Sequence, residues 1–238
     1  MSSPTDFNLS PYYDDFTESK KFHRILFRPS FAVQARELTQ AQTILQNQME
    51  RMGDHFFKQG AMVIPGQVGL DIEYYAVKLS AKSLSTLSSY KNIEVTGATS
   101  GVVATIVTTV VTDGTDPDTV YVKYSKSGTN NVASVFQDGE TLNCSIESVS
   151  QTLTVSTTAT GSAASVKQGI YYINGFMVQT SDQTLILDKY TNAPSYRIGF
   201  TLTESFVTSN DDTSLNDNAA GSSNANAPGA HRFKIDLT

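Results

Sequence analysis

The chain has 238 residues with 17 basic and 23 acidic side chains, a net charge of −6, one cysteine and no tryptophan. Its 27 serines and 28 threonines outnumber the charged residues, which is typical of a protein rich in strands and turns. The acidic balance argues against a dedicated nucleic-acid-binding protein, and the single cysteine excludes an intramolecular disulfide framework. No run of about 18 apolar residues and no signal-peptide pattern occurs, so we expect a protein made in the cytoplasm.

Residues 1–30 are predicted to form an extended arm, because the segment has no apolar period and is punctuated by Pro11 and Pro29. Aromatic side chains spaced through such an arm are typical anchors for a groove on another subunit. The alternative is that they pack back onto the core of their own chain. The nearby arginines could pair with a partner's acidic surface or with Glu18 and Glu37. The candidate partner-binding residues are Tyr12, Tyr13, Phe16, Phe22, Arg24, Arg28 and Arg36.

Residues 31–60 are predicted to contain one long helix, from about Phe31 to Lys58, with Ser30 as N-cap and Gly60 as the C-terminal glycine. Apolar residues recur at spacings of three and four and define one stripe: Leu38, Ala41, Leu45, Met49, Met52 and Phe56. The opposite face is rich in Gln and Asn instead of Glu–Lys pairs. We expect either that this face lies against another chain, around a symmetry axis, or that the helix packs on its own sheet. The candidate oligomer-interface residues are Leu38, Ala41, Leu45, Gln48 and Met52.

Residues 61–91 are expected to form a strand and the connection to an inserted β domain at 92–160, which we predict to be a small barrel or sandwich. The β-branched run 102–112 and the alternating run 118–124 predict a hairpin or neighbouring strands. Cys144 is expected to be a small core residue of this domain.

Residues 161–238 are expected to form a second β region. Asn174-Gly175 predicts a tight hairpin within 169–178, and further strands are expected at 185–187, 196–203 and 232–238. The polar loop 209–229 is long for a compact domain, so we expect it to be a binding or wrapping loop. Because a strand closes the sequence, we expect the chain to continue into a longer polypeptide. The expected fold class is therefore mainly β with one long N-terminal α-helix.

No motif in the sequence supports catalysis. His23, His55 and His231 lack the spacing of metal ligands, and the chain contains no GxSxG, P-loop or GxGxxG motif. The aspartates of the polar loop lack the alternation and the distal glutamate of a calcium loop. We expect a protein that is not an enzyme, with no catalytic residue, no metal and no cofactor.

Two segments of the chain resemble a family of tailed-bacteriophage virion proteins. The run from Phe22 to Gln48 is similar to that family's Phe-Arg-Pro-Gly-x-x-Val-Gln-Ala-Arg-Glu-Leu-Thr-Gln motif, with Ser30 where the family usually has glycine. The run from Asp212 to Arg232 is similar to a second family segment, which ends in Ala-Pro-Gly-Ala-x-Arg. The resemblance covers residues 11 to about 80 and 165–238, and the 92–160 region only loosely.

The resemblance implies a structural component of a phage tail, either a baseplate protein or the baseplate-proximal part of a tail fibre. Such proteins reside in the virion, are made in the host cytoplasm, are usually homotrimers and bind other baseplate or tail proteins. Neither nucleic-acid binding nor membrane insertion is expected. The alternative is a host-receptor or carbohydrate-binding module of a tail fibre, with Tyr171, Tyr172, Tyr190 and Tyr196 as candidates. A glycan-cleaving tailspike would need paired carboxylates in a groove, and none can be nominated.

Overall fold

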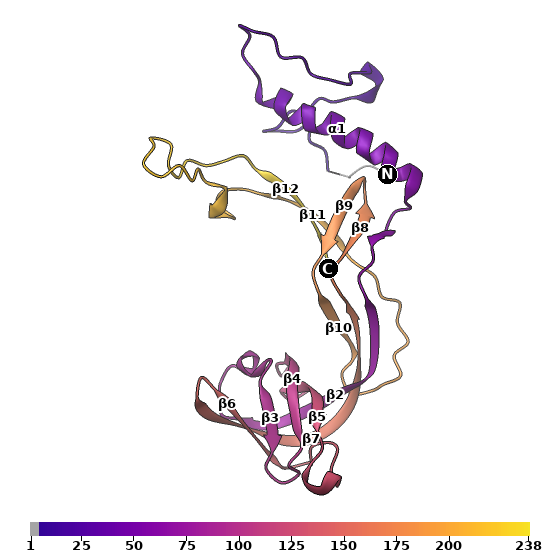
Figure 1. Ribbon diagram of the computed structural model, residues 1–238, viewed down its shortest axis with the longest axis vertical. Helices are drawn as coiled ribbons and strands as arrows, with labels where there is room; N and C mark the ends of the chain where they lie inside the picture. The colour runs from indigo at the N-terminus through magenta and orange to yellow at the C-terminus, as the bar shows by residue number, and fades with distance from the viewer. Residues whose placement is uncertain (1–4) are drawn as a thin grey trace. The chain divides into compact units, whose positions relative to one another are not determined.

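The computed structural model describes residues 5–238 and is mainly β with a single α-helix near the N-terminus, which confirms the fold class expected from the sequence (Figure 1). The described residues divide into two compact units. The first comprises residues 5–67, 167–183 and 198–238, and the second comprises residues 68–166 and 184–197. Within residues 5–238, no helix has the length and apolar character needed to span a membrane.

The second unit is a closed antiparallel barrel. Neighbouring strands pair in the order β7-β2-β5-β4-β3-β6, and β6 pairs back onto β7, so the ring has no free edge. A further strand, β10, adds to β7. The strands are β2 (Val68–Lys82), β3 (Glu94–Gly97), β4 (Val103–Val110), β5 (Thr119–Lys126), β6 (Thr141–Ile146), β7 (Val149–Val166) and β10 (Gln183–Asp188).

The barrel core consists mainly of Val, Leu and Ile side chains of its strands, with the buried aromatic rings of Tyr90 and Phe136 from the connections. Val95, Ile106, Leu142 and Leu153 are fully buried there. The predicted neighbours 102–112 and 118–124 are β4 and β5, which pair antiparallel. Cys144 is half-buried against this core, and burial raises the pKa of its thiol.

The first unit contains two small antiparallel sheets. One has the order β1-β8-β9, with β1 (Met62–Ile64), β8 (Gly169–Ile173) and β9 (Phe176–Thr180), and the other pairs β11 (Leu202–Val207) with β12 (Arg232–Leu237). Asn174 and Gly175 form the predicted tight turn between β8 and β9, with φ of 48° and 83°. The small hydrophobic core of the first unit is formed by Tyr171 of β8, Val178 of β9 and Leu237 of β12.

The helix, α1 (Ala35–Phe56), is shorter than predicted at both ends. Its N-cap is Gln34 and not Ser30, because Gln34 and Glu37 form a reciprocal capping box. Its C-cap is Phe57, so Gly60 lies beyond the helix end. Ser30 instead adopts a φ of 69°, which a helix N-cap does not use.

The strand predicted at 196–203 is wrong for most of its length. Only Leu202 and Thr203 belong to a strand, β11, which continues to Val207. In the β11–β12 ladder, Leu202 lies opposite Leu237. Thr201 and Thr238 continue the pairing with two backbone hydrogen bonds, of 2.7 and 3.1 Å, so the strand prediction fails over residues 196–200.

Candidate assembly interface

The polar face of α1 packs on segments of its own chain. The Gln46 side-chain amide donates to the Gly175 carbonyl at 2.7 Å, and the Gln40 amide donates to Asp15 Oδ1 at 3.1 Å. The expectation that this amide-rich face meets another chain is therefore wrong for both glutamines. The amides satisfy backbone and carboxylate groups of the β8–β9 turn and of the arm.

Tyr172 of β8 fixes the C-terminal half of α1. Its hydroxyl donates to the Glu50 carbonyl and to Asp54 Oδ1, both at 2.9 Å. The ring lies so close to Gly53 that a Cβ there would be 2.5 Å from Tyr172 Cε2. Burial, together with the neighbouring Asp54 carboxylate, raises the pKa of Tyr172 to about 12, while its hydrogen bond lowers the pKa of Asp54.

The apolar stripe of α1 consequently faces away from the chain's own contacts. Its large side chains are more than half exposed: Leu38 55%, Leu45 66%, Met49 51%, Met52 57% and Phe56 71%. Of the predicted oligomer-interface residues, Gln48 is likewise exposed and Ala41 is half-buried. A helix in a compact domain normally buries such a stripe, so this face is unpartnered within residues 5–238.

The arm divides into an inward and an outward part. Tyr12 stacks on Phe206 with ring centroids 5.1 Å apart, and its hydroxyl lies 2.8 Å from His231 Nδ1. Phe7, which the sequence analysis missed, packs edge-on against Phe206 and Phe233. This part of the arm therefore follows the alternative of packing on its own chain.

The outward part of the arm carries large apolar side chains without cover. Tyr13 is 57% exposed, and the segment before the helix adds Phe22, Leu26, Phe27, Phe31 and Val33, each more than half exposed. Phe16 is half-buried. Two of the predicted anchors, Tyr13 and Phe22, are thus available to a partner.

The arginines near the helix start do not pair as the intramolecular alternative proposed. Glu18 forms its ion pair with Arg51, and Glu37 accepts from the Gln34 backbone. Arg36 donates to the Gln34 side chain at 2.7 Å. The Arg28 guanidinium lies 4.7 Å from the centre of the Phe31 ring, while Arg24 is exposed.

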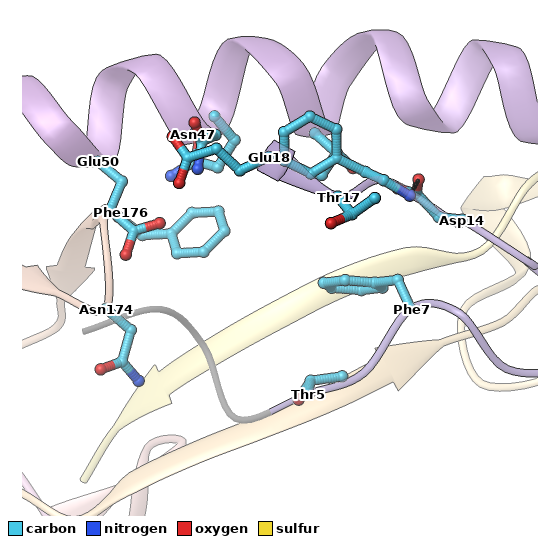
Figure 2. Close-up of a pocket in the computed structure, with 12 residues that line it drawn as sticks. Thr5, Phe7, Asp14, Thr17, Glu18, Asn47, Glu50, Asn174 and Phe176 are labelled. Atoms are coloured by element: carbon cyan, nitrogen blue, oxygen red, sulfur yellow. Dashed lines mark hydrogen bonds between the residues drawn. The ribbon is translucent and has the colours of Figure 1, made fainter. Parts of the chain in front are cut away.

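A pocket of about 430 Å³ lies where the arm, α1 and the β8–β9 hairpin meet, and Figure 2 shows the labelled side chains beneath the helix. Asp14, only 5% exposed, accepts a hydrogen bond from the Thr43 hydroxyl and so ties the arm to α1. Burial raises the pKa of Glu50. No trio of histidine, cysteine or carboxylate side chains that could hold a metal is found in residues 5–238. The pocket therefore has the character of a packing site for the arm.

The polar loop 209–229 is closed by its own hydrogen bonds. The Asp217 backbone N–H donates to the Ala227 carbonyl, and the Asn226 backbone N–H donates to the Asp217 carbonyl, both at 2.9 Å. The Asp211 carboxylate accepts from the hydroxyl and the backbone N–H of Thr208, and the Asp212 carboxylate accepts from Ser214, which lowers both pKa values. These aspartates therefore act as turn acceptors.

The tyrosines of the receptor-binding alternative are unequally accessible. Tyr171 and Tyr172 are buried, so neither presents its ring to a glycan. Tyr190 is half-buried with the Lys78 ammonium 3.7 Å from its ring centre, and Tyr196 is 62% exposed.

A family profile described as "Domain of unknown function (DUF4815)" matches residues 10–134 and 123–238, which together span nearly the whole chain. No curated protein and no solved structure matches the chain. The family description names no activity, ligand or partner.

Proposed function

The chain belongs to the DUF4815 family, a domain of unknown function, and we propose that it is a structural virion protein of a phage tail. In this proposal it is a baseplate component or the baseplate-proximal part of a tail fibre. It acts by attachment to other tail proteins and to copies of itself, as a homotrimer, and it catalyses no reaction.

The observation that carries this proposal is the amount of apolar side chain left in water on the arm and on α1. The chain of 25.8 kDa has an accessible surface of 15,315 Å². Even two separate compact units of half that mass would together expose only roughly 12,600 Å². This excess of total surface, together with the exposed apolar side chains of the arm and α1, is typical of a protein that partner chains cover in part.

Attachment has a sufficient physical basis in these side chains. Burying one Leu, Met or Phe side chain is worth roughly 1.5–3 kcal/mol relative to leaving it in water, before the cost of association. Phe22, Leu26 and Phe27 lie within six residues of one another and are 52–78% exposed. A groove on a neighbouring tail protein that covers these three would anchor the arm.

The test replaces Phe22, Leu26 and Phe27 together by serine in a phage that carries the chain as its only copy. The variant chain is expected to fold and accumulate but to be lost from purified virions, as measured by quantitative mass spectrometry. A matched control replaces Val111, Val132 and Val149, three exposed residues of the barrel unit, by serine. Equal incorporation of both variants would contradict attachment through the arm, and absence of the unaltered chain from virions would contradict the proposed function.

A further inference from the structure

The exposed stripe of α1 follows a heptad repeat as well as the period of a single helix. The exposed residues on this face of α1 recur at spacings that alternate between three and four residues. They are Ala35, Leu38, Gln42, Leu45, Met49, Met52 and Phe56. This alternation defines three heptads, with Leu38, Leu45 and Met52 at d and Ala35, Gln42, Met49 and Phe56 at a. All seven residues are exposed.

The a and d residues together form what we call the seam. Each of them lies where a second helix packed along this face would bury it. Over the 22 residues of α1 the seam runs for about 33 Å. Tyr172 and the β8–β9 turn hold the flank of α1 that carries Gln46 and Gly53, beside the seam, and leave the a and d residues themselves exposed. A partner is therefore free to approach on the side of the stripe.

Charge on the seam fits another copy of the same chain. No a or d residue is charged, and the flanking e and g positions hold Thr39, Gln46, Gly53, Ala41, Gln48 and His55, none of them Asp, Glu, Lys or Arg. A coiled coil that selects a different partner normally uses opposite charges at e and g. An uncharged seam imposes no repulsion between identical helices brought together in register.

We propose that α1 forms a parallel, in-register coiled coil with the α1 helices of further copies of this chain. Leu38 then packs against Leu38, Leu45 against Leu45 and Met52 against Met52 around a common axis. Only the number of copies, three, rests on the proposed function. The proposed seam differs from the interface predicted from the sequence, because Gln42, Met49 and Phe56 belong to it, whereas Ala41 and Gln48 flank it.

Cysteine cross-linking of the purified full chain tests both the seam and its direction. In a Cys144→Ser background, Leu38→Cys and Met52→Cys are each oxidised alone and also as a mixture. Parallel pairing brings each cysteine next to its own copy, so each variant alone is expected to give a covalent dimer. Antiparallel pairing packs a positions against d positions of the neighbouring helix and would separate each cysteine from its own copy, so neither variant alone would cross-link.

The matched control is Arg36→Cys, an exposed position on the same helix but off the seam, which is expected to form no covalent dimer on oxidation. Circular dichroism verifies that every variant keeps its helix. Cross-linking in the mixture alone, or at position 36 as readily as at 38 and 52, would overturn the proposal. If no variant cross-links while the unaltered chain is still found in virions, the coiled coil is overturned and the proposed function stands.

Discussion

At the scale of single residues, Glu140 holds together one end of the barrel. Its carboxylate is 4% exposed and accepts from the Ser100 backbone at 3.0 Å and the Ser100 hydroxyl at 2.9 Å. It also accepts from the backbone N–H groups of Thr99 at 3.2 Å and Gln137 at 2.6 Å. One side chain thus joins the β3–β4 turn to the residues that lead into β6.

Replacing Glu140 by alanine is expected to lower the free energy of unfolding by roughly 3 kcal/mol, because four donors then lose their acceptor in a largely buried site. Denaturant titration followed by circular dichroism measures the change. The control is Glu94→Ala, at an exposed position of β3. A loss no greater than that of the control would show that water replaces the carboxylate freely.

Asp118 makes the stability of the barrel sensitive to acid. Its ion pair with Lys82, helped by the Thr112 backbone N–H at 2.9 Å, holds the pKa of Asp118 below its usual range. A carboxyl group whose pKa is lower in the folded than in the unfolded state contributes its full stabilisation of the fold at pH values above its unfolded pKa of about 4. That contribution is lost as the pH falls through the pKa of the folded state.

The denaturation midpoint of the unaltered chain is therefore expected to fall as the pH drops from about 5 toward 2. In Asp118→Asn the midpoint is expected to be lower at about pH 6 and to fall less steeply on acidification, because the titrating group is gone. Identical pH profiles for the two proteins would contradict this role.

At the scale of elements, the contact between α1 and β8 decides which face of the helix is free. Gly53 and Tyr172 are 119 positions apart, yet the ring fills the space that any larger residue at 53 would need. The contact turns the amide-rich face of α1 toward the hairpin. The apolar seam then points outward as a direct consequence.

Gly53→Ala is expected to release α1 from the hairpin, although alanine favours a helix over glycine by about 1 kcal/mol. Faster amide hydrogen exchange in residues 50–56 measures the release. Gly199→Ala is the control, because a Cβ there meets nothing within 4 Å; equal exchange in both alanine variants would refute the clash.

The sequence allows local features to be predicted better than distant ones. Asn174-Gly175 and the β4–β5 pair follow from neighbouring residues, as does the existence of the apolar stripe on α1. The contact of Phe7 with β11 and β12 joins residues about two hundred positions apart, and no local pattern marks it. The direction of the helix faces depends on Tyr172 in the same way, so the sequence left open whether Gln40 and Gln46 meet a partner or their own chain.

At the scale of the whole molecule, the account centres on exposed apolar surface that other chains cover. The arm contributes anchors such as Phe22 and Leu26, and α1 contributes the heptad seam. These two surfaces have separate tasks in the proposal, since the arm binds other tail proteins and the seam binds copies of the chain. Altering one is expected to leave the other intact.

The most direct measurement is the solution mass of the full chain by light scattering at several concentrations. The account predicts a stable mass near three times 25.8 kDa, which falls to 25.8 kDa when Leu45 and Met52 are both replaced by lysine. Val132→Lys, at an exposed barrel position, should keep the mass of the unaltered chain. A mass of 25.8 kDa at every concentration, or an oligomer that survives the two seam lysines, would contradict the account.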